Sequence, residues 1–313
     1  MRRRRTLAAV FAGLAAFAAI GLAACTNESA AAPGKVDVVA AFYPLQFVSE
    51  EVGGGHVTVT NLAKPGAEPH DLELSARQVG RVSDAEVIVY LKGFQPAMDD
   101  AVEQVGGDRA FDVSTAVPLL QAGESDHTHE GEEEPAHEGE SSTDPHIWLD
   151  PIRLAMIGQQ VADRLAAQDP EHAADYTANA SRLRTELTGL DQEYATGLAT
   201  CQRRELVTSH AAFGYLADRY HLEQVGLTGV TPDTEPAPQR LASVAAEARE
   251  HGATTIFFET LVSPKVADTI AAEVGARTAV LDPIEGLRPG ATGDYFSIMR
   301  TNLTAIRTAL DCS

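Results

Sequence analysis

The 313-residue sequence predicts an α/β fold of two lobes with mostly parallel sheets, joined by one long rigid helix. Short runs rich in Val and Ile alternate with helical stretches in the first half of the chain, and the same alternation returns in the second half. A single long helical segment lies between the two halves. Apolar residues make up 44% and charged residues 22% of the chain, which is a globular composition long enough for a sizeable core.

The N-terminus is typical of an export signal. Basic residues 2–5 precede an apolar run at 7–20 that is too short for an ordinary membrane span. The following sequence "LAAC", which ends at Cys25, resembles a lipobox. This resemblance implies cleavage before Cys25 and lipidation of its thiol, the alternative being a plain secretory signal. We therefore expect a signal peptide at 1–24 and a tether at 25–35.

The first lobe is expected to span 36–168 and the second 201–313. Their Val- and Ile-rich runs have strand length, and the stretches between them carry helical patterns. In the first lobe, we expect strands at 36–42, 57–63 and 85–91 and helices at 75–85 and 95–105. In the second lobe, we expect strands at 205–209, 254–260 and 277–283 and a helix at 238–253.

A linking helix is predicted over residues 169–200. Asp169 would cap its N-terminus and Pro170 would occupy its first position. About 30 helical residues span roughly 45 Å, which suits a helix running along both lobes. Apolar residues recur at three- and four-residue steps along one face of this segment: Leu183, Leu187, Leu190, Tyr194 and Leu198.

Charge and cysteine content narrow the possible functions. The formal net charge of −21 argues against nucleic acid as a partner, because phosphate binding needs clustered Lys and Arg. If Cys25 carries lipid, Cys201 and Cys312 remain in an oxidising compartment. We expect these two to form a disulfide, and two free buried thiols are the alternative.

Four residues in separate motifs are candidate metal ligands. They are His70 in "PGAEPHDLEL", His146 in "DPHIWLDP", His210 in "LVTSHAAFGYL" and Asp282 in "AVLDPIEG". Each is expected at or near the C-terminal end of a strand, the edge where open α/β sheets bind ligands. Three neutral imidazoles and one carboxylate match a tetrahedral zinc site. A manganese site would favour more carboxylates.

Two further groups of side chains surround these candidates. Glu68 and Asp71 flank His70 and could support it, or they could be ordinary loop carboxylates. The segment 124–143 is rich in acids and has neither Lys nor Arg, so we expect a mobile loop at the mouth of the site. Its histidines predict a weak, multivalent zinc-binding loop, and a solvated spacer is the alternative; they are His127, His129 and His137.

Four long segments resemble one family. "GAEPHDLELSARQV", "DPHIWLDP", "TSHAAFGYLADRY" and "FFETLVSPKVADT" are similar to the metal-binding solute-binding proteins of ABC transporters, in the zinc-uptake (ZnuA-like) branch. The resemblance runs from about Val36 to Cys312. It implies two α/β lobes joined by one rigid helix, with the metal in the cleft between the lobes. It also implies a monomeric lipoprotein at the outer face of the cytoplasmic membrane, which delivers its metal to a permease and its ATPase.

The resemblance also implies which residues bind the metal. His70 and His146 would come from the first lobe, and His210 and Asp282 from the second. Because some zinc-binding members replace the fourth protein ligand by water, Asp282 stays open. Glu259 in "FFET" is either an alternative ligand or a partner that orients a ligating histidine.

The expected function is capture of Zn²⁺ for import. An enzyme is not expected, because the sequence has no HExxH, GxSxG or P-loop motif. Two alternatives remain open: a manganese or broad divalent-metal protein of the same family, and an adhesin or zinc-sequestering lipoprotein not coupled to transport.

Overall fold

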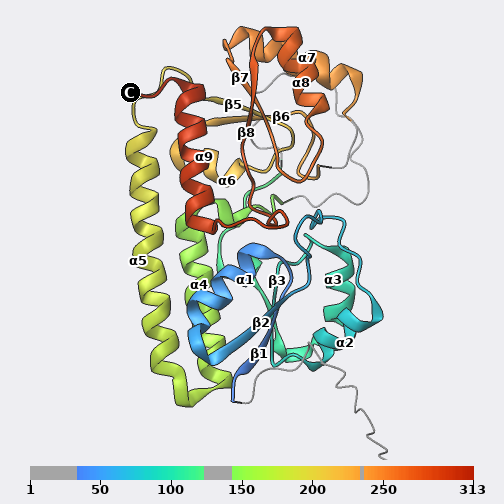
Figure 1. Ribbon diagram of the computed structural model, residues 1–313, viewed down its shortest axis with the longest axis vertical. Helices are drawn as coiled ribbons and strands as arrows, with labels where there is room; N and C mark the ends of the chain where they lie inside the picture. The colour runs from blue at the N-terminus through green and yellow to red at the C-terminus, as the bar shows by residue number, and fades with distance from the viewer. Residues whose placement is uncertain (1–33, 123–142, 233–235) are drawn as a thin grey trace, which may run out of the picture. The chain divides into compact units, whose positions relative to one another are not determined.

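Two four-stranded parallel sheets form the framework of the computed structural model, which describes residues 34–122, 143–232 and 236–313 (Figure 1). The first sheet has the strand order β2-β1-β3-β4 and the second β6-β5-β7-β8. The strands of the first are β1 (Val36–Ala40), β2 (Val57–Asn61), β3 (Val87–Tyr90) and β4 (Ala110–Asp112). Those of the second are β5 (Glu205–Thr208), β6 (Glu223–Gly226), β7 (Thr255–Phe258) and β8 (Arg277–Val280). The predicted two-lobed α/β fold is confirmed.

Each sheet carries its own crossover helices, as parallel strands require. The first lobe has α1 (Tyr43–Gly53), α2 (Ala76–Asp84) and α3 (Pro96–Ala101), and α3 continues into a π-helical turn at Val102–Gly106. The second has α6 (Gly214–Tyr220), α7 (Pro238–Glu250) and α8 (Lys265–Val274). Ser75 caps α2 by accepting a hydrogen bond from the Gln78 amide, which explains why that helix begins where it does.

The long linking helix is present as α5 (Ala173–Gly197), but it begins later than the sequence indicated. Residues Pro170–His172 form a 3₁₀ turn, and the Asp169 side chain does not cap them. Its carboxylate instead accepts hydrogen bonds from the Tyr176 hydroxyl at 2.8 Å and from His172 Nδ1 at 2.7 Å. The Asp-Pro step therefore starts a turn into the helix rather than the helix itself.

Helix α5 does not link the lobes alone. It packs against α4 (Pro151–Gln168) and α1 of the first lobe and against α9 (Tyr295–Leu310), which follows the second sheet (Figure 1). Asp150 caps α4 by accepting from the amides of Ile152 and Arg153. No helix in the described part of the chain is both long and apolar enough to cross a membrane.

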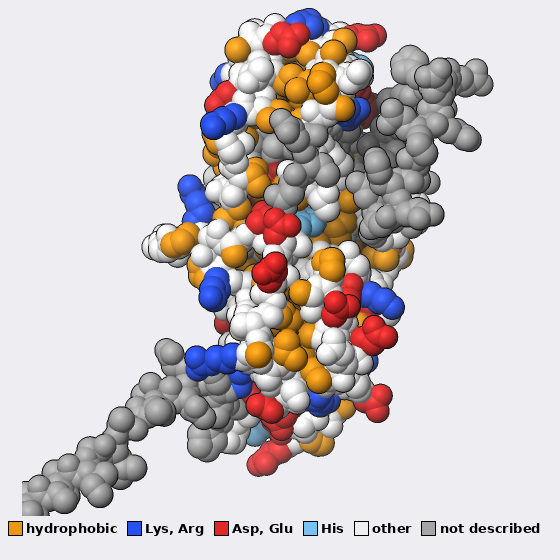
Figure 2. All heavy atoms as spheres, turned by 90° about the vertical axis from the view of Figure 1, so that its right-hand side faces the viewer, with side chains coloured by type: hydrophobic (Ala, Val, Ile, Leu, Met, Phe, Trp, Pro, Cys, Tyr) orange, Lys and Arg blue, Asp and Glu red, His pale blue; other side chains and the backbone are white. Residues whose placement is uncertain are grey.

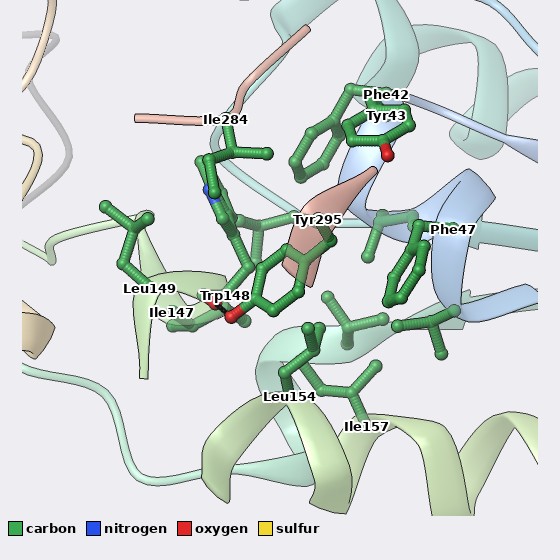
Figure 3. Close-up of a cluster of buried hydrophobic side chains, with 14 of the residues drawn as sticks. Phe42, Tyr43, Phe47, Ile147, Trp148, Leu149, Leu154, Ile157, Ile284 and Tyr295 are labelled. Carbon is green, nitrogen blue, oxygen red and sulfur yellow. Dashed lines mark hydrogen bonds between the residues drawn. The ribbon is translucent and has the colours of Figure 1, made fainter. Parts of the chain in front are cut away.

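Buried aromatic side chains from both ends of the chain meet in one core (Figure 3). The rings of Phe47 on α1 and Tyr295 on α9 stack with their centroids 5.3 Å apart. The Tyr295 hydroxyl donates to the Trp148 carbonyl at 2.6 Å, and the Trp148 indole donates to the Pro283 carbonyl at 2.7 Å. Trp148 thus connects the turn before α4 to the loop after β8.

The expected disulfide between Cys201 and Cys312 is confirmed, and it ties the segment after α5 to the end of α9.

Several sequence expectations lie outside the described residues. They are the signal peptide at 1–24, Cys25 and most of the tether, and nearly all of the loop 124–143 with its histidines.

Candidate metal centre

His70 lies in the long loop between β2 and α2, where two contacts hold it. The Gln95 side chain donates to the Pro69 carbonyl at 3.0 Å, and the His70 amide donates to Glu68 Oε1 at 3.2 Å. The imidazole packs edge-on against Phe94, with ring centroids 4.4 Å apart. The loop therefore presents His70 in one orientation, with only 6% of its side chain exposed.

His146 comes directly before the short 3₁₀ turn Ile147–Leu149 that leads into α4, and not at the end of a strand as the sequence suggested. Asp144 holds it twice with the same oxygen. The His146 amide and ring Nδ1 donate to Asp144 Oδ1 at 2.9 and 2.7 Å. Because Nδ1 carries a proton in this bond, Nε2 is left facing the cluster as a possible ligand.

His210 follows the C-terminal end of β5, as expected. The hydroxyl of Thr208 donates to the His210 carbonyl at 2.7 Å, which fixes the chain as it leaves the strand. Nδ1 of His210 donates to Glu259 Oε1, which also accepts from the Ser209 hydroxyl at 2.5 Å. Glu259 thus contacts the back of the imidazole and orients it, which is one of the two roles that the sequence left open.

Glu285 is the carboxylate that joins the three histidines, and it was not among the ligands expected from the sequence. Asp282, expected in this place, lies outside the group and builds the turn that presents Glu285. Its Oδ1 accepts from the Ile284 amide at 2.8 Å, and its Oδ2 accepts from the Thr260 hydroxyl at 3.1 Å. Ile284 has a φ of +60°, which is rare for a β-branched residue and reverses the chain before Glu285.

The Nε2 atoms of all three histidines converge on Glu285 Oε1. The distances are 3.1 Å from His146, 3.3 Å from His210 and 3.5 Å from His70. Donors that lie 2.0–2.2 Å from one tetrahedral ion are about 3.3–3.6 Å apart, so the group has nearly the spacing of a zinc site. Within the described chain, His70 Nε2 and Glu285 Oε2 are buried without a hydrogen-bond partner. Such orphaned atoms are unusual unless a ligand completes them.

Burial and neighbouring charges together set the pKa values of the cluster. Burial lowers the pKa of His70. Burial also opposes charge on His146 and His210, but nearby carboxylates outweigh it and raise both pKa values, that of His210 to about 10. Burial would raise the pKa of Glu285, yet its contacts with the three imidazoles hold it well below its usual range. A divalent cation would therefore displace protons from imidazoles that face an ionised carboxylate.

Glu68 and Asp71, the two acids that flank His70, differ in their surroundings. Burial, and then the nearby Glu285 carboxylate, raise the pKa of Glu68 to about 9, so that its side chain is protonated at neutral pH. Asp71 is exposed to solvent. Of the two, Glu68 supports the His70 backbone and borders the cluster.

Two observations in the sequence could have located Glu285. The segment "DPIEG" holds a second acid three residues after Asp282, and the Asp-Pro step typically makes a turn in which the first carboxylate bonds its own backbone. A side chain used in this way is not free to bind a metal. The next carboxylate then becomes the better candidate.

The fold and the cluster together define a class: a two-lobed α/β protein whose loops bring three imidazoles and one carboxylate to a buried point. The chain belongs to the ZnuA family, described as "Zinc-uptake complex component A periplasmic", whose model matches residues 38–309.

Individual relatives agree with this assignment. The chain is 35% identical over 307 residues to the "Zinc-binding lipoprotein AdcA" of Streptococcus pneumoniae, covering 95% of this chain and 60% of that one. It therefore spans about three fifths of that relative's length. It is 33% identical to the "High-affinity zinc uptake system protein ZnuA" of Bacillus subtilis, covering 92% and 93% of the two chains. The solved "Zn(II)-bound ZnuA-like domain of Streptococcus pneumoniae AdcA" superposes with a TM-score of 0.73 at 31% identity, over 89% of this chain and all of that one.

Proposed function

We propose that this protein captures Zn²⁺ outside the cytoplasm and delivers it to an ABC permease for import. The observation that carries the proposal is the convergence of three imidazole Nε2 atoms on one Glu285 oxygen at 3.1–3.5 Å. In this proposal His70, His146, His210 and Glu285 are the four ligands of the transported ion.

The ligand set favours zinc over manganese. Three imidazoles and a single carboxylate bring one negative charge to the ion and suit borderline-soft Zn²⁺, whereas hard Mn²⁺ prefers oxygen donors. The Nδ1 atoms of His146 and His210 both contact carboxylates, an arrangement that fixes the tautomer and makes Nε2 more basic. The names of the AdcA and ZnuA relatives point to the same metal.

Binding, rather than catalysis, is the activity that this site supports. Catalytic zinc sites hold the metal with three protein ligands and keep a position open for water. Here four protein donors surround one point, and His146, His210 and Glu285 have fully buried side chains. We therefore assign no reaction to the site.

The proposal places the protein on the outer face of the cytoplasmic membrane, held by lipid on Cys25. The lipobox-like sequence and the lipoprotein name of the AdcA relative support this anchor. The partners would be a membrane permease and its ATPase. Acidic and basic side chains are interspersed on the face shown in Figure 2, where the described residues form no continuous basic area of the kind that nucleic acid requires.

Metal analysis tests the proposal directly. Protein purified without added metal should contain zinc at about one equivalent, and competition with a chelator of known affinity should measure its Kd. His210→Ala should abolish this tight binding. His221→Asn is the matched control, because His221 is exposed on the same lobe and Asn tolerates its left-handed conformation. Equal zinc affinity in the wild type and His210→Ala would refute the proposed site.

Growth tests the transport step separately. Deletion of the gene should impair growth under zinc limitation, and added zinc should restore it. Unchanged growth and unchanged cellular zinc, in a strain lacking other zinc importers, would contradict import while leaving zinc binding intact.

A further inference from the structure

A second group of metal-ligating side chains lies at the opposite edge of the second sheet. Glu205 begins β5 and Glu223 begins β6, and the two are directly paired in the parallel register. Paired residues of neighbouring strands project from the same face, so their carboxylates lie side by side. Like charges placed side by side on neighbouring strands repel each other, and a cation shared by the two carboxylates would offset that repulsion.

His251 joins this pair from the end of α7. Its amide donates to the Glu247 carbonyl at 3.0 Å, which ends the helix, and Gly252 then takes a φ of +63° that turns the chain toward β7. This turn brings His251 Nδ1 to 3.1 Å from Glu205 Oε2. One donor atom from each of Glu205, Glu223 and His251 lies within 4.8 Å of the others.

Glu205 is the buried member of the group, a carboxylate with only 8% of its surface exposed. One of its oxygens faces His251, while Oε1 is buried with no hydrogen-bond partner in the described part of the protein. Glu247 and Glu250 on α7 add further negative charge around it. A buried, half-satisfied carboxylate in negative surroundings is costly, and a bound cation would offset that cost.

We propose that Glu205, Glu223 and His251 form a second, weaker site for a divalent cation of the zinc type. Glu205 forms the floor of the site, and the exposed Glu223 and His251 form its rim. One imidazole and two carboxylates suit Zn²⁺, and the open rim leaves the remaining positions to water. A cation held there would neutralise the paired acids and fasten the end of α7 to β5 and β6.

This second site is independent of the metal centre formed by the three histidines and Glu285. Glu205 stands at the start of β5, and His210 follows its end, so the two residues are roughly 16 Å apart at about 3.3 Å per residue. The inference therefore stands even if the proposed transport function fails. The loop 124–143 contributes none of the three residues of this second site.

Site-specific NMR of the full-length protein tests the proposal with Zn²⁺ alone as the probe. After the first equivalent, further zinc should shift the His251 ring signals and the backbone amides of 223–226. Glu205→Gln and His251→Gln should each remove these shifts. The His210→Ala protein, which lacks a ligand of the three-histidine centre, should keep them.

The matched control is Glu247→Gln, which lies one helical turn before His251 on α7 and removes one negative charge near Glu205 without removing a ligand. It should retain the zinc-dependent shifts with at most a few-fold weaker binding. Three results would each overturn the proposal: no shift at His251 up to millimolar zinc, an unchanged response in Glu205→Gln, or an equal loss in Glu247→Gln and His251→Gln.

Discussion

The Nε2 atoms of His146 and His210 lie 3.3 Å apart, although 64 residues separate the two histidines in the chain. The first is held by Asp144 before α4, and the second by Glu259 after β5. Each carboxylate engages Nδ1, so both imidazoles present Nε2 to the same point. This relationship, completed by Glu285, underlies most of the predictions below.

Two conservative substitutions distinguish the proposed metal ligand, Glu285, from Asp282, which supports the turn before it. Glu285→Gln should weaken zinc binding by more than about 100-fold, because it removes the only carboxylate ligand and its charge. Asp282→Asn should change the affinity by less than about tenfold, because an amide oxygen can still accept from the Ile284 amide. Chelator competition measures both Kd values. A larger loss in Asp282→Asn would restore Asp282 as the ligand.

The carboxylates behind the histidines should also affect affinity. Asp144→Asn and Glu259→Gln should each weaken zinc binding by about 10- to 100-fold, because each replaces the charged acceptor behind an imidazole by a neutral amide and so makes the ligating Nε2 less basic. Asp71→Asn is the control, since Asp71 is an exposed acid in the His70 loop. Isothermal titration would show the effect. If Asp71→Asn weakened binding equally, general charge and not orientation would be responsible.

Zinc affinity should rise with pH. The pKa of His210 is raised to about 10, so the metal-free protein holds a proton at pH 7 that zinc must displace, and the raised pKa of His146 acts in the same direction. Binding should therefore release protons, which calorimetry in buffers of different ionisation enthalpy detects. An affinity that stayed constant between pH 6 and 8 would contradict protonated imidazoles in the free site.

The stability of the metal-free protein should show the opposite dependence on pH. The pKa of His210 rises from 6.5 to about 10 on folding, so its contribution to the free energy of unfolding is complete below pH 6.5. That contribution is lost as pH rises through 10. Chelator-treated wild type should therefore lose more thermal stability between pH 7 and 10 than His210→Ala does.

Trp148 should report metal binding. It is the only tryptophan of the chain, and its ring lies 5.3 Å from that of His146. Zinc changes the charge beside the indole, so its emission should change and saturate at one equivalent. His146→Ala is expected to abolish the response. An emission that is unchanged at stoichiometric zinc would count against His146 as a ligand.

The disulfide should stabilise the fold without affecting the zinc affinity of the metal centre. Replacing both Cys201 and Cys312 by Ala should lower the free energy of unfolding by about 4–5 kcal/mol, since the bridge closes a loop of 111 residues. Urea denaturation measures this loss. Zinc affinity should stay within a few-fold of wild type, because the bridge joins the end of α9 to the segment after α5 and not the ligand loops.

Much of this protein could be predicted from local sequence. The Val- and Ile-rich runs indicated strands that the structure contains, because buried parallel strands need apolar residues on both faces. The start of the long helix was harder to predict, because a carboxylate such as Asp169 can either cap a helix or accept a hydrogen bond from another side chain. Which of these it does depends on Tyr176 arriving beside it.

The sequence by itself determined the two-lobed α/β class, and it singled out the two cysteines that pair and the three histidines that meet in the cluster. These follow from periodicity, composition and long motifs, which are local properties of the chain. Only the tertiary structure decided that Glu285, and not Asp282, joins the histidines. The reason is the turn at Ile284, which occupies the Asp282 carboxylate and aims Glu285 at imidazoles from up to 215 residues away.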